Sequence, residues 1–112
     1  LLKDPSIDSV FTLAAAVTDS AALAIEQAGV GDKVKLASTD LSASILDRIK
    51  TGKQTMAVDQ QPYLQSFLAV TMLAATIDWG TDLATDPVLT GPAIVDASNV
   101  EATLAGVEAG TR

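Results

Sequence analysis

Strand patterns alternate with helix patterns along residues 10–78, and this alternation restricts the fold more than any other feature of the sequence. Short apolar runs bounded by turn residues predict strands at residues 10–15, 33–38 and 54–59. Stretches with apolar residues at helical spacing follow them and predict helices at residues 18–28, 42–50 and 62–78. The loops between these strands and helices are short, which favours right-handed crossovers between parallel strands. The expected fold is therefore α/β, with a parallel three-layer αβα sheet.

The residues at the helix starts support these boundaries. Thr18 or Asp19 is the expected N-cap of the first helix, and Ser42 is expected to start the second. Pro62 stands in the first turn of the third helix, where the missing N–H of proline is tolerated. That helix is apolar almost all round from Phe67, so we expect other elements to cover it on more than one side.

The pattern changes after Gly80. Two X-Pro turns precede a predicted short strand at residues 93–95 and a predicted final helix at residues 100–107. We therefore divide the chain into residues 1–80, which carry the βα units, and residues 81–112, which form a separate closing segment.

Composition excludes several classes of function. The 112 residues contain no cysteine and no histidine, so thiol nucleophiles, histidine-based triads and Cys or His metal sites are excluded. The formal net charge is −7 and the Lys and Arg residues form no basic stripe, which argues against nucleic acid as a partner. No glycine-rich phosphate cradle is present, so no nucleotide cofactor is expected. The longest apolar stretch, residues 67–77, is shorter than the ~20 residues that span a bilayer.

Polar side chains follow each predicted strand at the point where it ends. Thr18 and Asp19 follow the first strand, Asp40 follows the second, and Asp59 with Gln60 follows the third. Ligands of open parallel sheets bind beyond the C-terminal ends of the strands. Carboxylates accept hydrogen bonds from neighbouring hydroxyls, and an amide can donate and accept at once. This set of side chains indicates a neutral, polyhydroxylated ligand.

The same residues also fit different roles. Asp40 is equally well explained as a cap of the helix that begins at Ser42, and Asp19 is better explained as a cap than as a ligand residue. Asp40 and Asp59 would suit hydrolysis as a pair, but nothing in the sequence gives either the apolar setting of a general acid. A CheY-like receiver would need an acidic pair near its first strand and a strand-end lysine, and neither is evident. We expect a binding protein and not an enzyme.

Several segments resemble one known family. Residues 58–65, Val-Asp-Gln-Gln-Pro-Tyr-Leu-Gln, resemble the strand-to-helix turn of type I periplasmic sugar-binding proteins of the ribose-binding-like group. Ile-Lys-Thr-Gly at residues 49–52 precedes this turn as it does in the family, and residues 37–41 resemble the family's strand end. Residues 90–95, followed by Asn99, resemble its late segment. The matches cover nearly the whole chain in the family's order.

The resemblance implies a protein of two α/β lobes that are joined by a three-stranded hinge and close on one sugar. The closed form would dock on the membrane permease of an ABC importer, so the location would be periplasmic, or extracellular with a lipid anchor. The family's strand-end aspartate and pre-proline glutamine contact sugar, which gives these roles to Asp40 and Gln60, with Asp59 beside them. Many members carry an asparagine at the first strand end, for which Thr18 is a weak replacement. The implied ligand is a monosaccharide or polyol.

The resemblance also implies that this chain is a fragment. Residues 1–80 would form part of the C-terminal lobe and residues 81–112 the hinge-crossing and C-terminal segment, with Thr111–Arg112 resembling a natural end. The missing N-terminal portion would then be a partner of the exposed sheet edge and apolar helix, unless a second copy takes its place. The same fold also serves as the effector-sensing domain of LacI-type transcription regulators. A basic DNA-binding head would favour a regulator, and the Gln-Gln-Pro-Tyr-Leu-Gln string favours transport.

Overall fold

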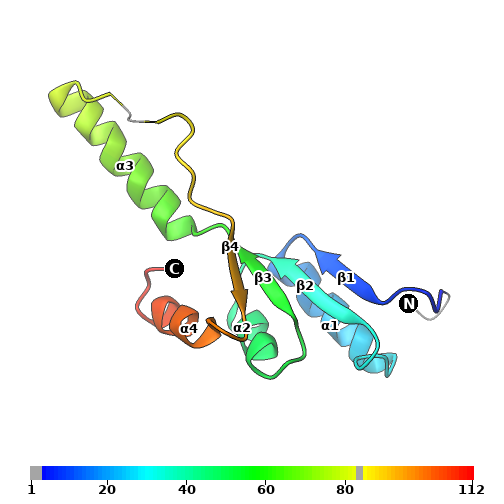
Figure 1. The fold of residues 1–112 in the computed structure, drawn as a ribbon. Coiled ribbons are helices and arrows are strands. Elements are labelled where there is room, and N and C mark those ends of the chain that lie inside the picture. Colours follow the sequence, from blue (N-terminus) through cyan, green and yellow to red (C-terminus); the bar gives the residue numbers. More distant parts are fainter. Residues whose placement is uncertain (1–3, 83–84) are drawn as a thin grey trace.

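The computed structural model describes residues 4–82 and 85–112 (Figure 1). The strands are β1 Ser9–Thr12, β2 Lys35–Thr39, β3 Met56–Asp59 and β4 Ala93–Asp96. The helices are α1 Ala15–Gln27, α2 Ala43–Lys50, α3 Pro62–Trp79 and α4 Val100–Glu108. This order confirms the alternation of strands and helices that the sequence predicts, including the short final strand and helix. None of the described helices is long and apolar enough to cross a membrane.

The four strands form one mixed sheet in the order β1-β2-β3-β4. β1 pairs with β2 and β2 with β3 in parallel, so the predicted βα units are confirmed. β4 pairs antiparallel with β3, with Ala57 opposite Val95. The sheet is mixed, unlike the wholly parallel one expected, because the chain leaves at the end of β3, runs out along α3 and returns to the same end.

Three helices, α1, α2 and α4, cover one face of the sheet (Figure 1). The larger core cluster lies between α2, α4 and the last two strands, and consists of Ile45, Leu46, Ile49, Ala57, Val95 and Val100. A smaller cluster under α1 consists of Ile25, Val34 and Leu36. Burying each such aliphatic side chain contributes about 1.5–3 kcal/mol, so this face accounts for most of the packing in the described chain.

The opposite face of the sheet carries no helix in the described residues. Alternation along the strands places Phe11 and Ile94 on this face, where they are 51% and 44% exposed. The predicted second helical layer is not formed because α3 projects away from the sheet (Figure 1). Only Gln60 and Gln61 separate β3 from α3. Length alone does not set this direction, because β1 and α1 are also joined by two residues and α1 packs on the sheet. The connection before α3 differs in the left-handed backbone of Gln61, which has a φ of 56°.

The apolar sequence of α3 predicts cover by other elements. The described residues do not provide it. No residue of α3 is buried. Phe67, Val70 and Ile77 are 54%, 70% and 72% exposed. With α3 extended in this way, the molecule measures 59 Å along its longest axis.

The first helix starts earlier than predicted. α1 begins at Ala15, with Ala14 as its extended N-cap, so Thr18 and Asp19 lie inside the helix and do not cap it. The alanines here are strong helix formers, and they only look like a continuation of the buried strand. Ser42 is confirmed as the N-cap of α2, where its hydroxyl oxygen accepts a bond from the backbone N–H of Ile45 at 3.2 Å. Pro62 is confirmed in the first turn of α3.

Candidate functional site

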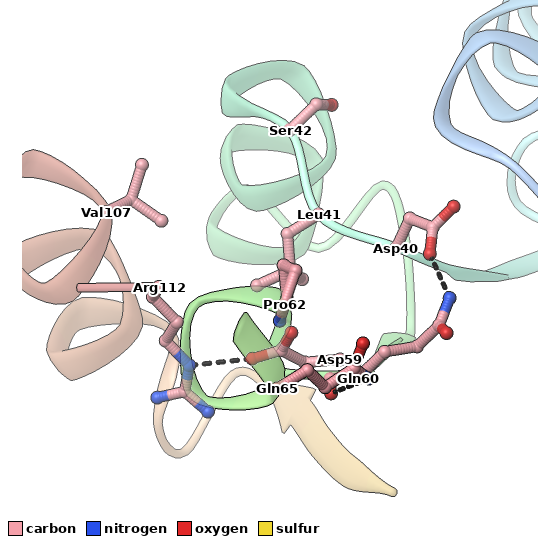
Figure 2. Close-up of a pocket in the computed structure, with 9 residues that line it drawn as sticks. All are labelled: Asp40, Leu41, Ser42, Asp59, Gln60, Pro62, Gln65, Val107 and Arg112. Atoms are coloured by element: carbon pink, nitrogen blue, oxygen red, sulfur yellow. Dashed lines mark hydrogen bonds and ion pairs between the residues drawn. The ribbon is translucent and has the colours of Figure 1, made fainter. Parts of the chain in front are cut away.

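The C-terminal ends of β2 and β3 lie together at one edge of the sheet because these strands are parallel. This edge brings Asp40, Asp59 and Gln60 close to one another, as expected from the sequence (Figure 2). An open pocket of about 260 Å³ lies here. Its lining consists of Asp40, Leu41, Ser42, Asp59, Gln60, Pro62, Gln65, Val107 and Arg112.

Asp40 and Gln60 face each other across the strand ends. The side-chain amide of Gln60 donates a 2.6 Å hydrogen bond to the Asp40 carboxylate (Figure 2). Asp40 has a left-handed backbone, with φ 66°, and its own N–H donates to the carbonyl of Val58 at 2.9 Å. This bond continues the pairing of β2 with β3 by one residue. Asp40 does not cap α2, because Ser42 does, and so the capping role considered for Asp40 is wrong.

The Asp40–Gln60 pair retains unused hydrogen-bonding capacity on an exposed surface. A carboxylate has a second oxygen, and a glutamine amide has a carbonyl oxygen and a second N–H. The pair therefore offers two acceptors and one donor at the mouth of the pocket. That combination fits adjacent hydroxyls of a polyol, each of which both donates and accepts.

Asp59 is buried, with 2% exposure, and both of its oxygens are engaged. Oδ1 accepts a bond from the backbone N–H of Gln61 at 2.8 Å. Oδ2 accepts a bond from Nε of Arg112 at 2.7 Å, forming an ion pair (Figure 2). Asp59 thus lies at the base of the pocket as a fully used carboxylate. It is not available in this arrangement as the partner of Asp40 in acid–base chemistry.

Thr18 is not brought to this pocket. It is completely buried at the end of the first turn of α1, and its hydroxyl lies 2.7 Å from that of Thr12 on β1. It also donates to the carbonyl of Ala14 at 2.8 Å. The side chain ties α1 to β1 inside the fold.

Three further residues of the site are not among those predicted from the sequence. Gln65 donates from its side chain to the carbonyl of Gln60 at 2.7 Å, and Gln61 donates to the carbonyl of Thr90 at 2.6 Å. The Gln-Gln-Pro-Tyr-Leu-Gln string contains both Gln61 and Gln65. Arg112 reaches Asp59 across 53 residues of sequence, and no local pattern indicates such a contact.

No group of three or more acidic, histidine or cysteine side chains that could hold a metal ion occurs within residues 4–82 and 85–112.

Comparison with known proteins agrees with this architecture. A family profile described as a periplasmic binding protein domain matches residues 1–82. The fold is also similar to the crystal structure of a carbohydrate transporter from Acidothermus cellulolyticus 11B in complex with myo-inositol. That protein is 39% identical with a TM-score of 0.85, and the match covers 98% of this chain and 38% of that one. No significant match occurs among curated proteins.

Two more distant structures share the fold. The myo-inositol binding protein of Caulobacter, bound to myo-inositol, is 27% identical with a TM-score of 0.76, over 90% of this chain and 34% of that one. A protein from Bacteroides fragilis assigned as a LacI transcriptional regulator is 18% identical with a TM-score of 0.75, over 90% and 34%. At that last identity the likeness concerns the fold alone. The chain spans between about a third and two fifths of the length of these three proteins.

Proposed function

This chain belongs to the periplasmic binding protein domain family, and from that premise we propose that it forms part of the substrate-binding component of an ABC sugar importer. The ligand is a neutral monosaccharide or polyol, captured reversibly outside the cytoplasmic membrane. The protein acts by binding and release, not by catalysis. The importer's permease and the remaining part of a two-lobed protein are the proposed partners.

The observation that carries this proposal is the Asp40–Gln60 pair at the mouth of the pocket. Without ligand the two side chains satisfy each other through one bond. A polyol arriving there exchanges that bond for hydrogen bonds from its own hydroxyls to the carboxylate and the amide. Hydrogen bonds to a charged group contribute about 1.5–3 kcal/mol each, which is enough to make Asp40 the principal anchor.

The second supporting observation is where the chain passes between the sheet and α3. We call residues 59–62 and 90–93 the neck, because the chain leaves the sheet through the first segment and returns through the second. The two segments are joined by the bond from Gln61 to Thr90 and by the Thr90 hydroxyl, which donates to the carbonyl of Gln60 at 3.2 Å. In our proposal the neck bends as a hinge and a second lobe closes over the open pocket, which raises the buried share of the ligand.

Myo-inositol is the first ligand to test, because two of the similar structures hold it. Isothermal titration of the full-length protein with myo-inositol and a panel of neutral hexoses and pentoses should give saturable binding to at least one of them. Glucose 6-phosphate serves as a charged comparison and should bind far more weakly, since the site presents a carboxylate and no phosphate cradle. A protein that binds none of the neutral polyols would contradict the proposal.

Two substitutions test the site itself. Asp40→Asn and Gln60→Ala should each weaken the bound polyol about tenfold or more, which corresponds to ~1.4 kcal/mol or more. Asp47→Asn and Gln27→Ala are matched controls, because these side chains are exposed on α2 and α1 and do not line the pocket. Unchanged affinity in Asp40→Asn would show that the ligand binds elsewhere.

An effector-sensing domain of a LacI-type regulator is the second candidate, and the likeness of fold to the Bacteroides fragilis protein is the observation in its favour. An electrophoretic mobility assay with the full-length protein distinguishes the two. A transport component should shift no DNA even at low salt, whereas a regulator should shift its operator in a polyol-dependent manner.

A further inference from the structure

The buried carboxylate of Asp59 at the base of the pocket depends on a residue that is remote in sequence. Arg112 Nε donates to Asp59 Oδ2 at 2.7 Å, and the Arg112 side chain is itself only 28% exposed. A carboxylate with 2% exposure cannot be hydrated freely, so this ion pair carries much of its stabilisation.

Local structure at the end of α4 directs Arg112 to this position. Gly110 has a left-handed φ of 69°, and the N–H of Thr111 donates back to the carbonyl of Gly106 at 3.0 Å. This pattern is a Schellman ending, which folds the chain back over the last helical turn. The stem of Arg112 lies close to Gly106, where a Cβ would meet its Cβ and Cδ at an ordinary van der Waals distance of 3.5 Å. The arginine stem thus lies against the end of the helix with its guanidinium at Asp59.

The other oxygen of Asp59 holds the turn that presents Gln60. Oδ1 accepts the N–H of Gln61, whose backbone is left-handed at φ 56°. Gln60 stands between these two residues in the chain, and its amide reaches Asp40 (Figure 2). Fixing Asp59 therefore fixes the backbone on both sides of Gln60.

We propose that Arg112 is a positioning residue of the polyol site. Its ion pair fixes the Asp59 carboxylate, which holds the turn at Gln61 and so orients the Gln60 amide toward the ligand. It makes no ligand contact of its own in this role. Without Arg112, Asp59 is left buried with one oxygen unpaired and turns toward water. The Gln61 N–H then loses its acceptor, and Gln60 loses its fixed direction.

This inference rests on the proposed polyol binding, so its test separates the two. In titrations of the full-length protein with myo-inositol, or with the neutral sugar that binds best, Arg112→Met should weaken affinity about tenfold with unchanged stoichiometry. In a Gln60→Ala background the same substitution should cost less than about twofold, because its effect passes through Gln60. Arg112→Lys should recover most of the loss, since it restores a cation beside Asp59.

Lys50→Met is the matched control, because Lys50 forms an exposed ion pair with Glu101 between α2 and α4 and lies outside the pocket. It should leave the affinity unchanged. Equal losses from Arg112→Met in both backgrounds, or no loss at all, would overturn the proposal. If Arg112→Met does not fold, Arg112→Gln keeps a donor to Asp59 without the charge and is judged by the same comparison.

A measurement without ligand decides the inference even if no polyol binds. In amide NMR spectra of the full-length protein, Arg112→Met should move the backbone resonance of Gln61 and the side-chain amide resonances of Gln60. The resonances of the core residues Ile45 and Leu46 should stay in place. If the two glutamines are unaffected, Arg112 does not position them, whatever the protein binds.

Discussion

Two residues beside the pocket have backbone conformations that non-glycine residues rarely adopt. Asp40 and Gln61 have φ of 66° and 56°. Aspartate tolerates this region because its short side chain bonds locally, but a glutamine there is strained by about 1–2 kcal/mol. The strain at Gln61 is held by two bonds, from its N–H to Asp59 and from its side chain to Thr90. Strained residues held in this way are common where a protein presents a ligand-binding group.

The cost of this conformation can be measured by comparing Gln61→Val with Gln61→Gly. Both substitutions remove the side-chain bond to Thr90, so their difference isolates the backbone. Valine is disfavoured at positive φ and glycine is not, so the valine variant should unfold at lower urea, with a free energy of unfolding about 1–2 kcal/mol lower. Equal midpoints for the two variants would mean that the turn does not keep this conformation in solution.

At this scale the sequence predicts that Asp40 and Gln60 are neighbours, but it does not predict their contacts. Both follow predicted strands, and parallel strands end at one edge, so their proximity could be predicted. The sequence pattern misplaces Thr18 because the alanine-rich start of α1 resembles a strand. Arg112 could not be predicted, since its bond to Asp59 depends on how α4 packs and ends.

Between elements, polar side chains of α1, α2, β2 and the connection before β3 form a connected group. Arg48 on α2 bonds to Asp19 on α1 at 2.6 Å and to Gln54 at 3.3 Å. Gln54 is buried and donates to the buried hydroxyl of Ser38 on β2 at 2.8 Å. Asp19 also accepts from Ser44. The pKa of Asp19 is lowered, first by the hydrogen bond from Arg48 and then by that from Ser44.

The lowered pKa of Asp19 sets an acid dependence of stability. The pKa of Asp19 is lower in the folded state than in the unfolded state. Its ionised carboxylate therefore stabilises the fold fully at a pH above the ordinary aspartate pKa, and this stabilisation is lost as the pH falls through the lowered pKa. Thermal unfolding followed below about pH 4 should show this loss, and Asp19→Asn should flatten the slope. Arg48→Met removes the largest cause of the shift and should flatten it similarly, with Ser44→Ala showing a smaller effect. An acid slope in Arg48→Met that matches the unsubstituted protein would contradict the assignment.

The elements themselves show which patterns predict structure well. α2 has a strong helical stripe, a serine cap and a buried face, and its observed limits are close to the predicted ones. α3 begins where predicted and ends one residue later, but it lacks the expected cover within the described residues. An apolar pattern indicates that a helix needs a partner and does not indicate where that partner lies. The connection that leads into α3 contains the left-handed backbone of Gln61, which no helical pattern predicts.

At the scale of the whole molecule, packing is concentrated at one end. The radius of gyration is 17.8 Å, whereas a compact chain of this length has about 13 Å. The difference comes from α3, which packs on no other helix or strand to the extent that α1, α2 and α4 do. Helices in proteins gain most of their stability from tertiary packing, and α3 receives little of it from the rest of the described chain.

Hydrogen exchange should reveal this uneven stability. In the chain of residues 1–112 alone, the amides of α3 should exchange much faster than those of Ile45, Leu46 and Ile49 in α2, which are at most 1% exposed. The comparison is made by mass spectrometry after brief labelling. In a longer protein that covers α3, the same amides should become protected. Protection of α3 equal to that of α2 in the short chain would mean that α3 packs against something in solution, such as a second copy.

The neck also has a mechanical consequence. α3 has 18 residues and so reaches about 27 Å from its start at the pocket. A rotation of about 10° at Gln61 therefore sweeps the far end of the helix through roughly 5 Å, at 1.5 Å of length per residue. Gln60, beside the pivot, moves very little in the same rotation. The arrangement works as a lever with its short arm at the pocket, so a small adjustment at the strand ends is amplified into a large displacement at the far end of α3.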